Sequence, residues 1–218
     1  MSFSRFPPVE KADEDGLLAL GGSLSSEVLL EAYSSGIFPW PFEERYLAWF
    51  SPPKRAVLFL KDLRVPKSLL RLIKKGEYQI RINTCFKEVI EACARSPNRK
   101  GQHGTWITDS MIDAYCHLHK LGYAHSIEYF EHSKLKGGLY GVSIGRMFAG
   151  ESMFYDKPNA SKLALYHLVN LLKQQNVEWI DCQVMTRHLQ ALGAVEIERK
   201  SFIKMLRACS NSGKISWK

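Results

Sequence analysis

The segment WIDCQV, residues 179–184, places an acid and an amide two residues apart in an otherwise apolar stretch. Side chains two apart in a strand point to the same face, so Asp181 and Gln183 share one face and the apolar residues between and around them share the other. A buried carboxylate needs hydrogen-bond partners, so this polar face costs stability unless a site uses it. The pattern therefore indicates either a reaction site lined by the pair or an Asp181 that ties down a neighbouring loop.

Two further residues could take part in chemistry. Glu151, in the segment FAGESMF, is a second carboxylate among apolar and aromatic neighbours. Trp106, in GTWITD, precedes a predicted helix, where an indole can stack on a nucleobase or fill the core. A histidine-based site is not favoured, because His117 and His119 are two apart on a predicted helix and point in different directions.

The composition restricts the class of protein. The chain has 218 residues, 45% hydrophobic and 24% charged, which is typical of a globular protein that can bury a full core. It has no apolar run of about eighteen residues and no signal-peptide pattern, so we expect a cytoplasmic protein that does not enter the membrane. The five cysteines are scattered and include no C-x-x-C pair, so we expect no disulfide framework and no metal site.

The net charge of +8 suggests a polyanionic partner. The charge concentrates between Lys61 and Arg81, where there are seven basic and only two acidic residues. Within it, the segment VPKSLLRLIKKG predicts an amphipathic helix with leucines and isoleucine on one side. Its other side is basic and consists of Lys67, Arg71, Lys74 and Lys75. We favour contacts with nucleic-acid phosphates over a membrane surface, with a merely solvated face as the alternative.

The order of elements predicts an α+β fold. A helix at 26–35, capped by Ser25 and stopped by Gly36, lies among segments rich in Gly, Pro and aromatic residues, which predicts a small loop-rich N-terminal domain over residues 1–60. In residues 61–218 the pattern predicts strands near 78–82, 124–130, 137–144, 147–154, 178–184 and 194–199, with helices near 86–94, 109–122, 159–175 and 186–193. This second domain is expected to contain one mixed, mainly antiparallel sheet flanked by helices.

Short motifs between Asp15 and Ala194 resemble those of the leucyl/phenylalanyl-tRNA protein transferase family in order and spacing. They are DGLLALGG, GIFPW, WFSP with RAV, GTWIT, HSIE, GGLYGV, GESMF, NASK, DCQV and LGA. The resemblance implies a GNAT-like catalytic domain, no cofactor and a monomer that acts as a leucyltransferase. It also implies transfer of Leu or Phe, with Met as a further candidate, from aminoacyl-tRNA to an N-terminal Arg or Lys of acceptor proteins, which creates a degradation signal.

The resemblance also implies roles for particular residues. Asp181, Gln183 and Glu151 would form the catalytic group, and Trp40 and Trp106 would contact the terminal adenosine. The pocket for the transferred side chain would include Leu139, Phe148 and Leu168. Leu168 stands where the family is expected to have an aromatic residue, which leaves the preference between Leu and Phe open. The family's basic helix would correspond to Lys67, Arg71, Lys74 and Lys75.

The expected reaction needs no strong base. An aminoacyl-tRNA is an activated ester, and an α-amine with a pKa of about 7.7 to 8.0 is partly neutral at pH 7. Holding the two reactants together can supply roughly 7 to 11 kcal/mol. A neutral amide is a poor base, so Gln183, oriented by Asp181, is interpreted as a positioning group that accepts a hydrogen bond from the amine. A proton shuttle through the substrate ribose is the alternative.

Two other functions fit parts of the sequence. An acetyl-CoA-dependent GNAT enzyme would need a Gly-rich turn for the pyrophosphate, but the corresponding segment YDKPNASK contains no glycine. A non-catalytic RNA-binding module would explain the basic helix and the tryptophans but not the polar face of DCQV. Whether Glu151 or Asp181 meets the acceptor's cationic side chain stays open at this level.

Overall fold

The computed structural model describes residues 4–42, 46–96, 106–210 and 213–217. Its helices are α1 (Ser26–Ser34), α2 (Lys67–Lys75), α3 (Phe86–Arg95), α4 (Asp109–Lys120), α5 (Ala160–Gln174), α6 (Arg187–Leu192) and α7 (Arg199–Ser210). Its strands are β1 (Leu17–Leu20), β2 (Phe38–Phe42), β3 (Tyr46–Phe50), β4 (Lys54–Phe59), β5 (Gln79–Ile82), β6 (Ala124–Glu131), β7 (Lys134–Ile144), β8 (Met147–Tyr155), β9 (Trp179–Asp181) and β10 (Val195–Glu198). The predicted α+β class is confirmed.

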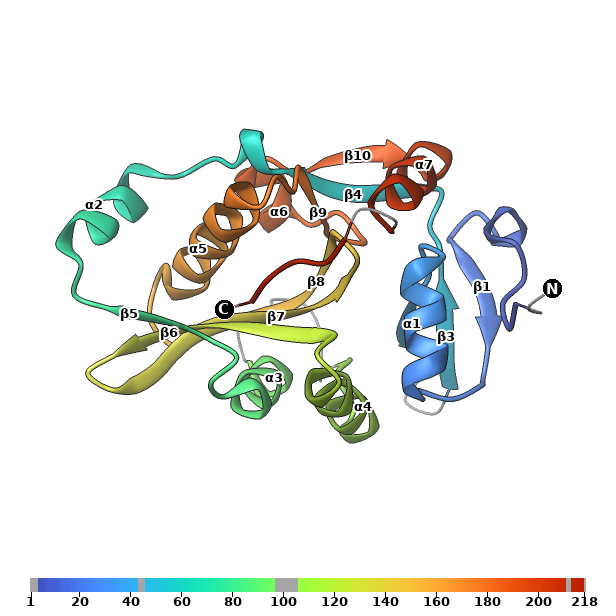
Figure 1. The fold of residues 1–218 in the computed structure, drawn as a ribbon, viewed down its shortest axis with the longest axis horizontal. Coiled ribbons are helices and arrows are strands. Elements are labelled where there is room, and N and C mark those ends of the chain that lie inside the picture. Colours follow the sequence, from blue (N-terminus) through green and yellow to red (C-terminus); the bar gives the residue numbers. More distant parts are fainter. Residues whose placement is uncertain (1–3, 43–45, 97–105, 211–212, 218) are drawn as a thin grey trace.

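The strands form two sheets (Figure 1). The smaller sheet has the order β1-β3-β2, and the larger has the order β10-β4-β9-β8-β7-β6-β5. All pairs in the larger sheet are antiparallel except β8 and β9, which are parallel and pair at Ala149 and Asp181. That exception follows from the chain path, because α5 connects β8 to β9 and a helical crossover returns the chain in the same direction.

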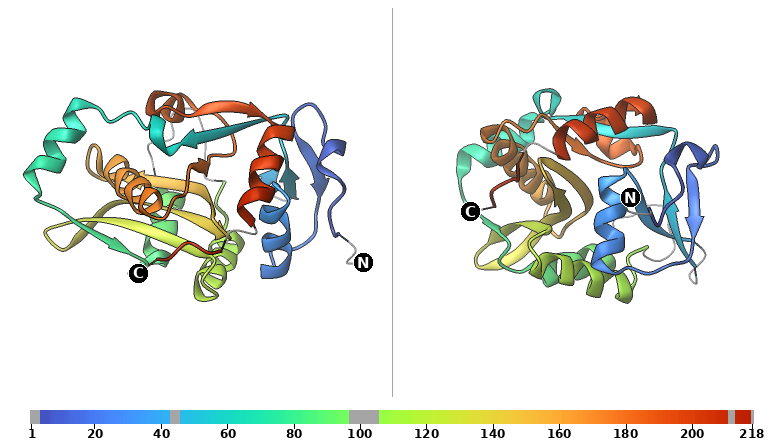
Figure 2. Two further views of the ribbon diagram at one scale, coloured as in Figure 1. Left: turned by 45° about the horizontal axis from the view of Figure 1, so that its top comes forward. Right: turned by 45° about the vertical axis from the view of Figure 1, so that its right-hand side comes forward.

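Helices cover both faces of the larger sheet. Alternate residues of β7 point to opposite sides: Tyr140 and Val142 join the core that includes α3 and α4, whereas Leu139 joins the core that includes α5. Figures 1 and 2 show α5 on one side of β6–β8 and α3 with α4 on the other. Among the described helices, none is both long and apolar enough to cross a membrane.

The N-terminal region is more regular than the sequence suggested. The sequence predicted a loop-rich α+β module over residues 1–60 but did not place its strands β1, β2 and β3, of which β2 carries Pro39 and Pro41. Proline cannot donate a ladder hydrogen bond, but it is tolerated in an edge strand, and β2 is at the edge of its sheet. The strand β4 falls within the expected domain 1–60 but pairs with β9 and β10 in the larger sheet. The two sheets therefore meet at the short segment between Phe50 and Lys54.

Two local expectations differ from the structure. Helix α7 was not anticipated, because it follows β10 directly without turn residues between them; it buries Phe202 and Leu206, one helical turn apart. The strand expected at 178–184 ends at Asp181, and Gln183 has a φ of +55°. The prediction that Asp181 and Gln183 share a strand face is therefore wrong, because the backbone turns between them.

Candidate active site

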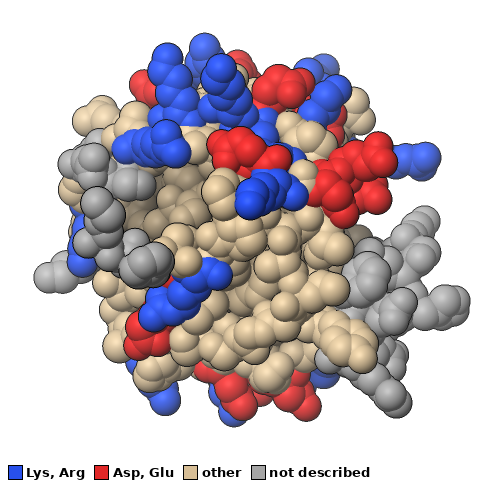
Figure 3. Space-filling model, turned by 90° about the vertical axis from the view of Figure 1, so that its right-hand side faces the viewer, with Lys and Arg blue, Asp and Glu red and all other residues tan. Residues whose placement is uncertain are grey.

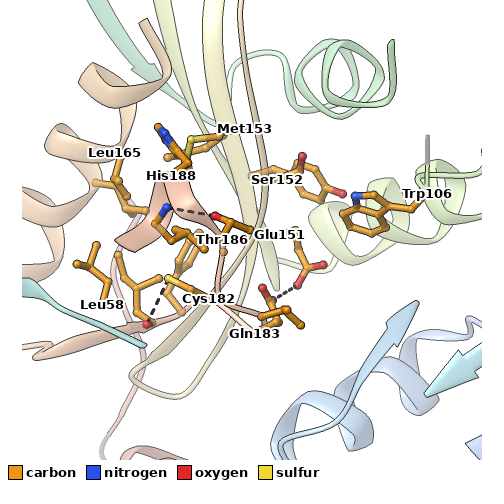
Figure 4. Close-up of a pocket in the computed structure, with 18 of the residues that line it drawn as sticks. Leu58, Trp106, Glu151, Ser152, Met153, Leu165, Cys182, Gln183, Thr186 and His188 are labelled. Atoms are coloured by element: carbon orange, nitrogen blue, oxygen red, sulfur yellow. Dashed lines mark hydrogen bonds between the residues drawn. The ribbon is translucent and has the colours of Figure 1, made fainter. Parts of the chain in front are cut away.

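A cavity of about 460 Å³ opens against the larger sheet (Figure 4). One part of its wall carries the two tryptophans with Glu151 and Gln183, and the rest is mainly apolar. The apolar part is lined by Leu58, Leu139, Phe148, Met153, Leu165, Leu168, Ile180 and Leu189. A molecule that fills the cavity therefore meets an apolar pocket, aromatic rings and a pair of polar side chains.

The polar wall is organised by a hydrogen bond between the side chains of Gln183 and Glu151. Gln183 donates from Nε2 to Oε1 of Glu151 at 2.9 Å. Because the amide nitrogen is used in this bond, the amide oxygen Oε1 of Gln183 is the group left to accept a hydrogen bond from a bound molecule. The unusual backbone of Gln183 carries its side chain to this wall.

Glu151 is held from its other side by a pair of buried tyrosines. Its Oε2 accepts a hydrogen bond from the hydroxyl of Tyr115 at 3.4 Å, and the hydroxyls of Tyr115 and Tyr33 lie 2.5 Å apart. Desolvation raises the pKa of Glu151 to about 7, a shift opposed by the tyrosine hydrogen bonds and by the Arg55 charge. Burial also raises the pKa of both tyrosine hydroxyls well above the usual value, so these remain protonated donors. Glu151 is consequently poised between its two protonation states near neutral pH.

Asp181 does not line the cavity but lies behind it, where it pairs with Arg55. The guanidinium donates from Nε and Nη2 to the two carboxylate oxygens at 2.8 and 2.7 Å. Oδ1 of Asp181 also accepts a hydrogen bond from the backbone N–H of Gln183 at 3.0 Å. Asp181 therefore fixes the backbone of Gln183, whereas Glu151 fixes its side chain. The expectation that the Asp181 side chain orients the amide directly is replaced by this division of contacts.

Arg55 connects the polar wall to the N-terminal region. Its guanidinium lies 4.6 Å from the ring centroids of both Phe38 and Phe202, and Nη1 donates to the carbonyl of Gly36 at 3.2 Å. The side chain is 2% exposed, so the charge is enclosed. Arg55, on β4, therefore contacts residues of β2, β9 and α7.

The two tryptophans lie against each other. Trp40 and Trp106 stack with ring centroids 5.0 Å apart and planes 13° apart, and both line the cavity. This spacing leaves no room for a base between them, so a nucleobase would stack on an outer face of the pair. Trp106 is seen beside the polar residues in Figure 4.

All three residues expected for the side-chain pocket line the cavity. Leu139 and Phe148 come from β7 and β8, and Leu168 comes from α5. The three are buried, at 3% exposure or less, so the pocket is enclosed by packed side chains. Their assignment to the transferred amino acid stays a prediction.

The basic helix lies away from this cavity. Lys67, Arg71, Lys74 and Lys75 are all exposed on α2, whereas Leu69 is buried against α5 and its neighbours. Leu70, expected on the apolar side, is exposed. Figures 1 and 2 place α2 at the end of the molecule opposite α1, so α2 is not part of the face in Figure 3, where the middle is largely uncharged. A partner that reaches both α2 and the cavity must be large.

Sequence reasoning missed three residues that organise the site. Arg55 was noticed only within a motif, although a cation in the apolar strand β4 is a signal that a buried carboxylate must lie nearby. Tyr33 and Tyr115 carry no such signal, because tyrosines on the buried faces of α1 and α4 look like ordinary core residues. Their meeting at Glu151 depends on helix packing.

Comparison with known proteins identifies the family. A model of the leucyl/phenylalanyl-tRNA protein transferase family matches residues 57–207, and a model of that family's N-terminal domain matches residues 22–53. A leucyl/phenylalanyl-tRNA–protein transferase of Chromobacterium violaceum is 50% identical over 204 residues, which cover 93% of this chain and 87% of that one. A Flavobacterium johnsoniae protein of the same name is 47% identical over 203 residues, which cover 93% of this chain and 95% of that one.

Among solved structures, the fold is similar to an aminoglycoside acetyltransferase from an uncultured soil metagenomic sample. The TM-score is 0.39 with 15% identity, over 61% of this chain and 88% of the other. The sequence matches, which span both parts of the chain, make the protein an aminoacyltransferase. It belongs to the leucyl/phenylalanyl-tRNA protein transferase family.

Proposed function

We propose that this protein transfers Leu or Phe from aminoacyl-tRNA to the α-amine of an N-terminal Arg or Lys on acceptor proteins, in the cytoplasm. The product carries a new N-terminal residue that marks it for degradation. The proposal is supported above all by the Gln183–Glu151 pair, which borders a cavity that also offers an apolar pocket and two stacked tryptophans. An aminoacyl-adenosine has the matching parts: an apolar side chain, an ester and a purine.

The transfer needs one proton movement. The amine nitrogen forms a bond to the ester carbonyl carbon, the bond from that carbon to the ribose oxygen breaks, and one proton passes from nitrogen to the departing oxygen. Gln183 holds the amine through its Oε1, and Glu151 holds the amide in that orientation. Positioning supplies most of the acceleration, since effective molarity can be worth roughly 7 to 11 kcal/mol.

The chemistry at the site favours direct transfer over a covalent enzyme intermediate. Cys182 lines the cavity, but burial raises the pKa of its thiol to about 12, so it stays protonated and is a poor nucleophile. The acceptor's N-terminal Arg or Lys adds a positive charge close to Glu151. That cation favours the ionised form of Glu151, so acceptor binding and ionisation of Glu151 support each other. We therefore assign the acceptor side chain to Glu151 rather than to Asp181, whose carboxylate is already occupied by Arg55.

The test uses radiolabelled Leu-tRNA and two peptides that differ only at the N-terminus, one beginning with free Arg and one with acetylated Arg. Label on the free peptide alone is the expected result. Label on neither, with the tRNA still bound, would indicate an RNA-binding protein without transfer chemistry. Acetylation of the free peptide when acetyl-CoA replaces the tRNA would indicate a GNAT-type enzyme instead.

A further inference from the structure

The segment Gly213–Trp217 packs beside the apolar end of the cavity. The backbone N–H of Ile215 donates to the carbonyl of Gly145 at 3.3 Å, and Ile215 is buried. Gln175, at the end of α5, exchanges two hydrogen bonds with the backbone of Ser216, at 2.7 and 2.9 Å. Figure 1 shows this segment crossing the sheet between α5 and the strands. Hydrogen bonds therefore hold the segment in place next to Trp217.

Trp217 lies against Phe148, which lines the cavity. Their ring centroids are 5.4 Å apart with planes tilted by 47°. The same indole stacks on the imidazole of His125 at 4.1 Å with an interplanar angle of 10°. Trp217 also packs against the apolar cluster that includes Leu139 and Leu168. One indole thus supports the pocket wall from the side away from the cavity.

His125 is a rigid support for this indole. Its Nε2 donates to the carbonyl of Gly122 at 3.1 Å, which leaves Nδ1 to accept from the side-chain amide of Asn83 at 3.0 Å. Both nitrogens are used by a neutral ring, and desolvation lowers the pKa of His125 to about 4. The stack therefore keeps one charge state through the neutral pH range.

The position of the Phe148 ring, on β8, also depends on Gly141 of the neighbouring strand β7. A Cβ added at Gly141 would lie 2.4 Å from Cζ of Phe148, so the ring occupies space that any other residue would fill. The absent side chain at Gly141 and the indole of Trp217 together fix where the ring lies. Because Phe148 lines the cavity, a shift of its ring would change the space available in the apolar pocket.

We propose that Trp217 is a specificity-determining residue, which fixes Phe148 and so limits the length of the amino-acid side chain that the pocket accepts. This inference rests on the proposed function, because it takes the apolar pocket as the place of the transferred Leu or Phe. Removing the indole allows Phe148 to move back and deepens the pocket, which favours the longer Phe side chain over Leu. One methylene in an apolar pocket changes discrimination by about tenfold or more, so a shift of that order is expected.

The experiment compares Trp217→Ala with the wild type by two readouts. The first is kcat/KM for Phe-tRNA relative to Leu-tRNA, and the second is the relative Kd of nonhydrolysable 3′-amide analogues of phenylalanyl- and leucyl-adenosine. Both ratios are expected to move about tenfold toward Phe. Trp217→Phe should keep most of the wild-type ratio, because the indole N–H has no hydrogen-bond partner among the described residues and only ring packing must be preserved.

Two further variants distinguish the effect of how firmly the Gly213–Trp217 segment is held from a general loss of stability. Gln175→Ala removes both bonds to Ser216 and should shift the ratios in the same direction by a smaller factor. Lys214→Ala is the matched control, because Lys214 lies in the same segment but is exposed, with its Nζ 5.7 Å from the ring centroid of Tyr123.

If Trp217→Ala lowers kcat/KM equally for Leu-tRNA and Phe-tRNA and leaves both ratios unchanged, the inference is overturned. Trp217 would then be a purely structural residue. If the wild type binds the two analogues selectively but transfers neither amino acid, the proposed function fails while the pocket inference stands on its binding ratio. Unselective binding in the wild type overturns the pocket inference alone.

Discussion

Arg55 and Asp181 form a bidentate ion pair in which both side chains are at most 2% exposed. Such a pair is weak evidence for net stability, because desolvating two charges offsets most of their attraction. Its consequence here is positional, since the same carboxylate oxygen that accepts from Nε of Arg55 also accepts from the backbone of Gln183. The reactive wall is thereby tied to a cation that touches the N-terminal sheet.

Breaking this pair should destabilise the protein strongly. Arg55→Met leaves a buried carboxylate without its cation, and the free energy of unfolding should fall by about 3 to 5 kcal/mol, measured by urea denaturation. The double variant Arg55→Met with Asp181→Leu should recover most of this loss but not the activity, because the bond to the Gln183 backbone is still absent. Full activity in the double variant would contradict the positional role of Asp181.

Gln183→Ala should reduce turnover far more than tRNA affinity. The variant removes the group that holds the attacking amine, and misplacement of about 1 Å can cost about 100-fold in rate. Single-turnover transfer and filter binding of the same aminoacyl-tRNA measure the two quantities separately. Gln190→Ala is a matched control, because Gln190 is exposed on α6 and does not line the cavity. Equal losses of turnover and affinity in Gln183→Ala would count against the assignment.

Glu151 should make both stability and activity depend on pH. Its pKa is raised from 4.5 to about 7 in the folded protein, so the folded state holds a proton that the unfolded state releases at lower pH. The stabilising contribution is thus complete below pH 4.5 and is lost as the pH rises through 7, a loss of about 3 kcal/mol. Transfer should increase as the pH rises through 7, because the ionised carboxylate is the form that pairs with the acceptor's cation.

The variant Glu151→Gln separates these two effects. It should abolish the fall in unfolding free energy between pH 5 and 8, measured by denaturation at several pH values. Its transfer rate should follow only the ionisation of the acceptor amine, near a pKa of about 8. A wild-type stability profile that Glu151→Gln leaves unchanged would show that another group titrates in this range.

The sequence predicted the larger sheet well because β6, β7 and β8 have long apolar patterns bounded by turns, and α5 has a continuous buried face. It also indicated Glu151, Gln183 and the tryptophans, which the fold brings to one cavity. It could not show that Gln183 lies beyond the strand, because its positive φ depends on contacts with Asp181 and Glu151. Nor could it place Arg55, Tyr33 or Trp217, since their partners lie far away in the chain.

Two glycines that pair across β7 and β8 offer a matched test of the pocket wall. In Gly141→Ala the new Cβ would lie 2.2 Å from the carbonyl oxygen of Ala149 and 2.4 Å from the Phe148 ring, so the strands must shift. Overpacking of this kind costs about 1 to 3 kcal/mol, and selectivity between Leu and Phe should change as Phe148 moves. In Gly150→Ala the nearest atoms are at 3.7 Å, an ordinary contact, so the melting temperature and the position of Phe148 should stay close to wild type. Similar behaviour of the two variants would mean that Phe148 is not constrained by Gly141.

The basic face of α2 should contribute to tRNA affinity through phosphate contacts. Lys74 and Lys75 are exposed in the last turn of the helix, so replacing both with Ala leaves the core contacts of Leu69 intact. If each lysine contacts one phosphate, the slope of log Kd against log salt should fall by about 0.7 to 0.9 per residue, measured by filter binding across a salt series. Transfer to the acceptor at saturating tRNA should change little, because α2 does not line the cavity. Lys134→Ala with Lys136→Ala, on β7, removes the same charge elsewhere; an equal fall in slope there would mean that the net charge of the protein, rather than α2, attracts the tRNA.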